Sequence, residues 1–205
     1  MVKISIIQLP EAYLSVIHGI KDILEYANDN FKPTFQIQIS ATAEIIQSKK
    51  HPDYMIIPPF RLGPGNHRPL IDARLTLALK KAAARGTIPV SVCAGAFYLC
   101  ASGLADKNQV TTHWILADAL SKTFPAVEVK KDKLLIDNGP FISAAGMTSY
   151  QDLALFLINR HMGKAEALTV ARIFLINPEN RSQLQYIAHN LDLAGTDSVL
   201  NKARA

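Results

Sequence analysis

The 205-residue sequence has few of the residues that cross-link a chain or bind a metal. It contains two cysteines, Cys93 and Cys100, and no cysteine or histidine cluster with the spacing of zinc ligands. Two cysteines that stand seven positions apart do not suggest a secreted disulfide framework. We therefore expect no disulfide, no structural metal and no other cofactor.

Long apolar runs are also missing. No run approaches the roughly 18 to 20 residues that a membrane span requires. The chain begins directly in a strand-like segment, without the charged, apolar and cleavage-site order of a signal peptide. We therefore expect a cytoplasmic protein with no membrane partner. Its length suits one domain, and 49% hydrophobic residues are enough for a well-buried core.

Positive charge is present but is not concentrated. The formal net charge is +5, yet lysine and arginine are scattered and form only short pairs such as Lys49–Lys50 and Lys80–Lys81. No basic stretch is interleaved with aromatic residues, and no helix pair has the spacing of a DNA-reading module. A solvated surface explains these charges better than direct DNA binding.

The hydrophobic period changes repeatedly between the strand and the helix values. Predicted strands are Lys3–Leu9, Thr34–Ser40, Tyr54–Ile57 and Ile88–Val92, with further turn-bearing strands, a hairpin among them, in Val127–Ser143. Predicted helices are Tyr13–Asn28, Leu70–Arg85, Ala94–Gly103, Trp114–Phe124, Tyr150–His161 and Ala165–Ile176. This alternation predicts an α/β fold in three layers, with a mostly parallel sheet sandwiched between helices.

Cys93 stands where a predicted buried strand turns sharply into a helix. Ser91 and Gly95 lie two residues to either side, which is the small-residue spacing of a strained elbow that projects a nucleophile. The stricter pattern has glycine where Ser91 stands. The free N–H groups of the following helix would favour a thiolate, and His113 is a possible second partner. Ligands in open α/β sheets gather beyond the carboxyl ends of the strands, so we expect a pocket here, with Pro58 nearby.

Structural roles compete with these functional ones. A free cysteine often packs as a small hydrophobe, and from the elbow alone this reading of Cys93 is as good as the functional one. Cys100 lies inside the predicted helix among apolar neighbours, and we interpret it as core. His113 could simply cap the helix that begins at Trp114, although Thr111 and Thr112 are also suitable caps.

Four segments resemble a known family. The residues VCAGAFYLCASGL (92–104) and VTTHW (110–114) resemble the ThiJ/PfpI superfamily. The residues HGIKDILEYAN (18–28) and ISAAGMTSYQDLALFLINRHMG (142–163) resemble the N-terminal sensing domains of AraC-type transcription regulators. The resemblance implies a flavodoxin-like three-layer fold, similar to that of class I glutamine amidotransferases. It also implies a homodimer.

By the same resemblance, Cys93 is an elbow nucleophile or a thiol that contacts ligand, with His113 close to it. Enzymatic relatives carry an acid in the opening segment, and the alignment places Val16 there, which cannot exchange a proton. Glu11 is a weak substitute that we expect on the surface.

The loop after the Tyr54–Ile57 strand departs from the family as well. Relatives place two glycines where Pro59 and Phe60 stand, so that backbone N–H groups can stabilise an oxyanion, and proline has no N–H. Losing one such donor commonly removes about 3 to 4 kcal/mol of transition-state stabilisation. Glutamine amidotransfer is disfavoured further, because the residue two beyond His113 is Leu116 and Asp118 fits no triad position.

The last segment, Arg181 to Ala205, resembles the junction that leads into the DNA-binding helices of AraC-type regulators. We therefore predict a sensing domain over residues 1–187 and a junction over 188–205, leading toward a DNA-binding domain outside this chain. The leading hypothesis is a noncatalytic domain of a transcription regulator that binds a small-molecule effector and meets DNA only through that further domain. Its predicted pocket residues are Cys93, Ala94, His113, Phe60 and Val16.

Two alternatives remain open. One is a cysteine-dependent hydrolase or hydratase of the isonitrile hydratase kind. The other is a redox sensor in which Cys93 forms a sulfenic acid.

Overall fold

A computed structural model describes residues 1–48, 51–62, 69–177 and 182–187. Its central sheet has six strands among the described residues. Their order across the sheet is β2 (Phe35–Ala41), β1 (Val2–Gln8), β3 (Tyr54–Ile57), β4 (Ile88–Val92), β8 (Ile142–Ala144) and β7 (Leu135–Asp137). The first five strands are parallel, and β7 runs antiparallel to β8 at the edge. The carboxyl ends of β1, β3, β4 and β8 therefore meet at one edge of the sheet.

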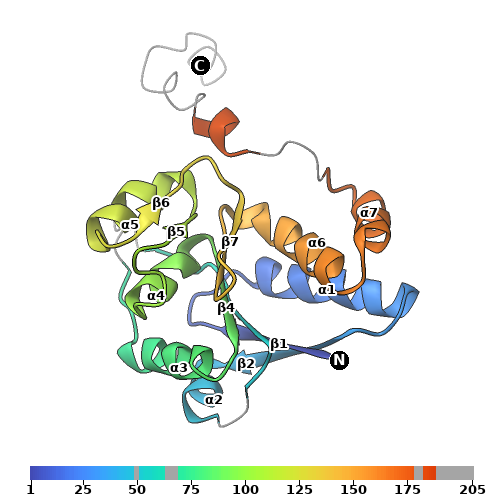
Figure 1. Cartoon of the computed structure of the whole chain (residues 1–205), viewed down its shortest axis with the longest axis horizontal. Coiled ribbons are helices and arrows are strands. Elements are labelled where there is room, and N and C mark those ends of the chain that lie inside the picture. The colour runs from blue at the N-terminus through green and yellow to red at the C-terminus, as the bar shows by residue number, and fades with distance from the viewer. Residues whose placement is uncertain (49–50, 63–68, 178–181, 188–205) are drawn as a thin grey trace, which may run out of the picture.

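Helices cover both faces of this sheet (Figure 1). One layer consists of α1 (Leu14–Asn30), α6 (Tyr150–His161) and α7 (Lys164–Ile173), and the other of α2 (Thr42–Gln47), α3 (Ala73–Ala83) and α4 (Ala96–Ala101). Because both faces are covered, the central strands are mostly apolar, and every residue of β3 is buried. The predicted three-layer α/β fold is confirmed.

The predicted strands of residues 127–143 divide between two sheets. β6 (Glu128–Val129) pairs in parallel with β5 (Gln109–Val110) in a small separate sheet, and α5 (Ala117–Thr123) connects the two. Only β7 and β8 form the predicted hairpin, through a turn at Asn138–Gly139 where Gly139 has a φ of 84°. The turn at Lys131–Asp132 instead carries the chain from the small sheet to the edge of the large one.

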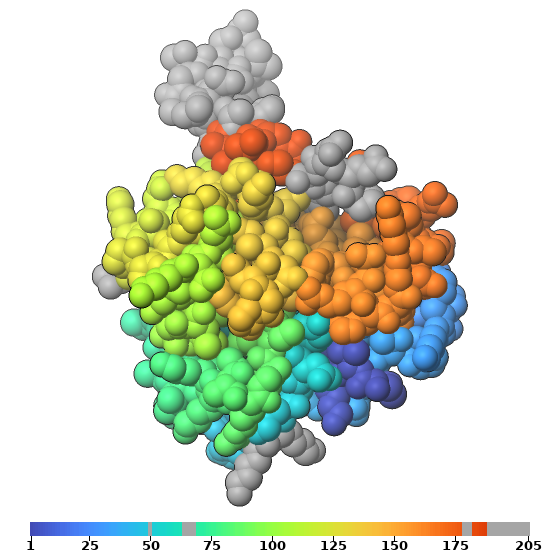
Figure 2. Space-filling model, in the orientation of Figure 1, coloured from blue at the N-terminus to red at the C-terminus, as the bar shows by residue number. Residues whose placement is uncertain are grey.

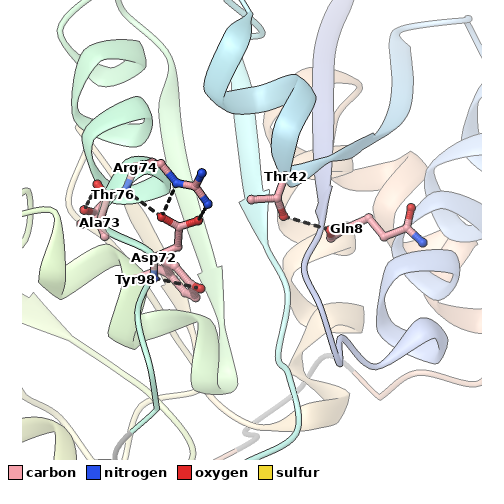
Figure 3. Close-up of polar contacts among 7 residues, drawn as sticks. All are labelled: Gln8, Thr42, Asp72, Ala73, Arg74, Thr76 and Tyr98. Atoms are coloured by element: carbon pink, nitrogen blue, oxygen red, sulfur yellow. Dashed lines mark hydrogen bonds and ion pairs between the residues drawn. The ribbon is translucent and has the colours of Figure 1, made fainter.

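One short helix is absent from the sequence-based prediction, and several predicted helices start later than expected; α5, for example, begins at Ala117 after a 3-10 turn, Trp114–Leu116. α2 was not predicted, because six residues are too short for a periodic signal; its start is held by the Thr42 hydroxyl, which donates to the Gln8 carbonyl (Figure 3). α3 begins at Ala73 rather than at Leu70, because Asp72 caps it. The Asp72 carboxylate accepts from the Arg74 backbone N–H at 2.9 Å and pairs with its guanidinium (Figure 3). These bonds lower the pKa of the Asp72 carboxyl.

In the described part of the chain, no helix is both long and apolar enough to span a membrane.

Candidate ligand pocket at the Cys93 elbow

The predicted elbow is present in the structure. β4 ends in extended backbone at Val92, and Cys93 then adopts a φ of 53°, in the left-handed region that non-glycine residues rarely occupy. A 3-10 turn, Cys93–Gly95, follows before α4 begins, so the helix starts later than the predicted Ala94. Strain of this kind clusters at functional sites, where surrounding structure enforces it.

Gly95 is what allows the elbow to pack against the neighbouring strand. A Cβ at this position would lie 2.3 Å from the carbonyl oxygen of Ile57, at the end of β3, and 3.2 Å from that of Pro58. No side chain fits at that distance from backbone. Pro58 therefore lies beside the elbow, as its place at a strand end predicts.

The Cys93 thiol is neutral, contrary to the expectation of a thiolate. The residue is 5% exposed, and burial raises the pKa of the thiol to about 11. The backbone N–H groups of Ala94 and His113 lie against the sulfur and lower the pKa, but by less than burial raises it. The sequence shows the helix start that favours a thiolate, but it does not show how deeply the sulfur is buried.

The His113 ring acts as the cap that sequence analysis gave as its structural role. Its Nδ1 accepts from the Ile115 backbone N–H at 3.2 Å, and burial lowers the pKa of the imidazole. The ring is therefore neutral at physiological pH, with its proton on Nε2. What His113 offers to Cys93 is its backbone N–H.

Two threonines fix the segment before His113, Thr112 to the elbow and Thr111 to β8. The Thr112 hydroxyl donates to the Cys93 carbonyl at 2.8 Å. The Thr111 backbone N–H donates to the Ser143 hydroxyl on β8 at 3.0 Å. The threonines therefore brace the motif instead of capping the helix.

A pocket of about 270 Å³ opens at this edge of the sheet. It is built from segments that follow β1, β3, β4, β5 and β8, and it is lined by Tyr13, Pro59, Phe60, Leu62, Cys93, Ala94, His113, Ile115, Leu116 and Met147. Four of the five predicted pocket residues, Phe60, Cys93, Ala94 and His113, are thereby brought together. The fifth, Val16, is 1% exposed within the packed side of α1 and is not part of this lining.

Sequence reasoning missed Tyr13, Leu62, Ile115, Leu116 and Met147 as lining residues. Tyr13 immediately precedes α1, and Met147 begins a 3-10 turn, Met147–Ser149, that follows β8, so both lie at the carboxyl edge of the sheet. Their places after the predicted strands are the only signal that the sequence offers for them.

Phe60 forms the wall between this pocket and a neighbouring cleft of about 550 Å³. Its ring makes an edge contact with Tyr98, with centroids 5.6 Å apart, and Tyr98 in turn contacts the Asp72 backbone (Figure 3). The loop is fixed to the segment after β1, because the Tyr13 N–H donates to the Pro59 carbonyl at 3.0 Å. Glu11 is exposed, as expected, and lines the cleft on the far side of Phe60.

No carboxylate lines the pocket among the described residues. Asp118 is exposed and pairs with Lys131 at 2.5 Å, while Leu116 is buried in the lining. Across the described ranges, no three His, Cys, Asp or Glu side chains are grouped so that they could hold a metal ion.

The fold and the elbow define an α/β protein with a cysteine at the end of a central strand. The DJ-1/PfpI family matches residues 29–160, and the chain belongs to this family. This match confirms the resemblance to the ThiJ/PfpI superfamily.

Among curated proteins, the HTH-type transcriptional regulator CdhR of Pseudomonas aeruginosa is 33% identical to this chain over 98 residues. The match covers 48% of this chain and 29% of CdhR, so the chain spans less than a third of that relative's length.

Two solved structures share the fold. An AraC family transcriptional regulator from Pseudomonas putida has a TM-score of 0.70 at 20% identity, covering 84% of this chain and 98% of that one. Drosophila melanogaster DJ-1beta has a TM-score of 0.67 at 17% identity, covering 85% and 98%.

Proposed function

We propose that this chain is the ligand-sensing, noncatalytic domain of a transcription regulator and that a small-molecule effector binds in the Cys93 pocket. The observation that carries the proposal is the state of the two polar groups at the elbow. The thiol is protonated, and the imidazole nitrogen that could act as a base already accepts from Ile115. The family relationship and the curated regulator relative support the regulatory role.

Catalysis by Cys93 would need a thiolate and a base to generate it. With a pKa of about 11, roughly one thiol in a thousand is ionised at pH 8. The pocket supplies no carboxylate from its described lining, and proline stands at one of the two oxyanion positions. The retained elbow is therefore better suited to contacting a ligand than to turning it over.

The lining also indicates the chemistry of the effector. The described lining residues are mostly apolar, and their side-chain polar groups are the Tyr13 hydroxyl, a neutral thiol and a neutral imidazole. A charged ligand would lose its hydration there without gaining an opposite charge. We therefore propose a small, uncharged, largely apolar effector.

In the full regulator, residues 1–187 would form the sensing domain, and DNA would be bound through a separate domain. This proposal is supported by the HTH-type relative, of which the chain spans only a part. The predicted junction, 188–205, lies outside the described residues. The natural coding sequence beyond Ala205 tests the arrangement. A helix-turn-helix pair encoded there supports it, and a stop codon contradicts it. The homodimer and the cytoplasmic location stay predictions.

Blocking the mouth of the pocket tests the binding site. Ile115 lines the pocket and is 51% exposed, so Ile115→Trp should fill the opening with little effect on folding. Leu77→Trp on α3 is the matched control, because Leu77 is 52% exposed and is not part of the lining. A panel of uncharged small molecules would be screened by thermal unfolding.

A ligand at a hundred times its Kd should stabilise the wild type and Leu77→Trp by about 2.7 kcal/mol, and Ile115→Trp by much less. Equal stabilisation of both variants would place the ligand elsewhere. Turnover of an isonitrile by the wild type that Cys93→Ser abolishes would favour the hydratase alternative.

A further inference from the structure

A buried glutamine joins the C-terminal part of the described chain to the pocket wall. Gln183 is 2% exposed, and its side-chain Nε2 donates to the carbonyl of Thr112 at 3.0 Å. Its Oε1 accepts from the Trp114 backbone N–H, also at 3.0 Å. The amide therefore binds the peptide groups on both sides of His113.

His113 is the residue through which this bracket reaches the pocket. Its ring is part of the pocket lining, and its backbone N–H lies against the Cys93 sulfur. Leaving a buried amide without hydrogen-bond partners costs about 1 to 3 kcal/mol of stability. This cost opposes any shift of residues 112–114 unless Gln183 moves with them. Movement at the pocket wall and movement at residue 183 are therefore coupled by hydrogen bonds.

A second set of bonds fixes the same segment without touching His113. The Ser182 hydroxyl and the Gln183 backbone N–H donate to the Asp132 carbonyl at 2.9 and 3.3 Å. The Gln183 side chain also donates to the carbonyls of Lys131 and Lys133. Figure 2 shows residues 182–187, in red, seated on the yellow region that contains this turn. The Gln183 amide group thus bonds both the turn and the pocket wall, whereas the Ser182 hydroxyl and the Gln183 backbone N–H bond the turn alone.

We propose that Gln183 is a positioning residue that transmits occupancy of the Cys93 pocket to the C-terminal end of the sensing domain. This inference rests on the proposed function, since it assigns the route by which a bound effector reaches the chain beyond residue 187. A ligand that displaces the His113 segment changes the bonds of Gln183 and so changes the stability of the turn of helix at residues 184–187. Coupling of this kind needs two arrangements whose balance each site biases.

The test places a small group in the pocket chemically, so that it does not depend on finding the effector. In a Cys100→Ala background, Cys93 is the sole thiol. Methyl methanethiosulfonate transfers its CH3S group to the Cys93 sulfur, forming a disulfide and releasing methanesulfinate, and dithiothreitol reverses the modification. Hydrogen exchange of the backbone amides of residues 184–187 is then measured with and without the CH3S group.

We expect the modification to change exchange at 184–187 about threefold or more in the background protein, and dithiothreitol to restore it. In Gln183→Met the exchange there should be about tenfold faster and no longer respond to the modification. Ser182→Ala is the matched control, because it removes the hydroxyl that donates to the Asp132 carbonyl and accepts from the Leu184 N–H, but it leaves the bracket around His113. It should retain the response.

A purely structural Gln183 would change the basal exchange but would leave the response to modification in place, and that result would overturn the proposal. A modification without effect in the background protein would do the same. Unchanged exchange in β1 and β4 shows that each variant is folded. If exchange at 184–187 responds to the CH3S group through Gln183 but no uncharged ligand binds the pocket, the proposed function fails while the inference stands. If a ligand binds but 184–187 do not respond, the inference alone fails.

Discussion

The two ends of the central sheet both carry a cleft, but their polar groups are arranged differently. At the amino end, a cleft of about 580 Å³ is lined by Tyr54 and His161, whose Oη and Nε2 are 2.8 Å apart, and the His161 ring also contacts Phe35 edge-on. These contacts hold α6 against the sheet. At the carboxyl end, the pocket is smaller, at about 270 Å³, yet it contains the strained Cys93 and backbone N–H groups directed at its sulfur. Backbone strain and donor placement therefore distinguish the candidate site, whereas cavity volume does not.

Gly95→Ala should have the largest effect, because it attacks the packing on which the carboxyl end depends. The new Cβ would lie 2.3 Å from the Ile57 carbonyl oxygen, and relief requires β3 and the elbow to separate. We expect a loss of about 3 kcal/mol in the free energy of unfolding, measured by urea denaturation.

Gly146→Ala is the control for this substitution, since its Cβ would meet only ordinary contacts, at 3.7 Å or more, at the same edge of the sheet. It should change stability by less than about 0.5 kcal/mol. Equal losses in both variants would show that the close approach at the elbow is not what makes Gly95 necessary.

Thiol reactivity tests the state of the elbow directly. With a pKa of about 11, the Cys93 thiolate fraction at pH 8 is roughly a hundredfold below that of a free cysteine. In a Cys100→Ala protein, the rate of alkylation by iodoacetamide should therefore be lower by about that factor, and it should rise nearly tenfold per pH unit up to pH 10. A rate at pH 8 equal to that of free cysteine would remove the neutral-thiol argument and strengthen the redox and enzyme alternatives.

Most of the fold follows from the hydrophobic period, because the long strands and helices bury continuous stripes. The sequence does not predict α2 or the pairing of β5 with β6, since segments of six and two residues carry no period. At the site, the small residues around Cys93 predict the elbow. The protonation of Cys93 and the place of Tyr13 in the lining depend on burial and on which loops meet, and these are properties of the packed molecule.

The smallest expected effect contrasts two half-buried histidines, one at each end of the sheet. Burial lowers the pKa of His161, the nearby charge of Arg160 lowers it further, and Asp53 opposes the shift. The unfolded chain therefore takes up the proton more readily, so the stability from neutral His161 is present above about pH 6.5 and is lost as the pH falls through its folded-state pKa. His161→Gln should make the free energy of unfolding fall less steeply between pH 7 and pH 5, as measured by urea denaturation at each pH.

His113→Gln should also flatten this slope, because burial lowers the pKa of His113 as well. Only the His113 variant should change the alkylation rate of Cys93, since the His113 side chain lines the same pocket as the thiol, whereas His161 lines the cleft at the other end of the sheet. A change in that rate in His161→Gln would mean that the two ends of the sheet are coupled and that the amino-end cleft is not purely structural.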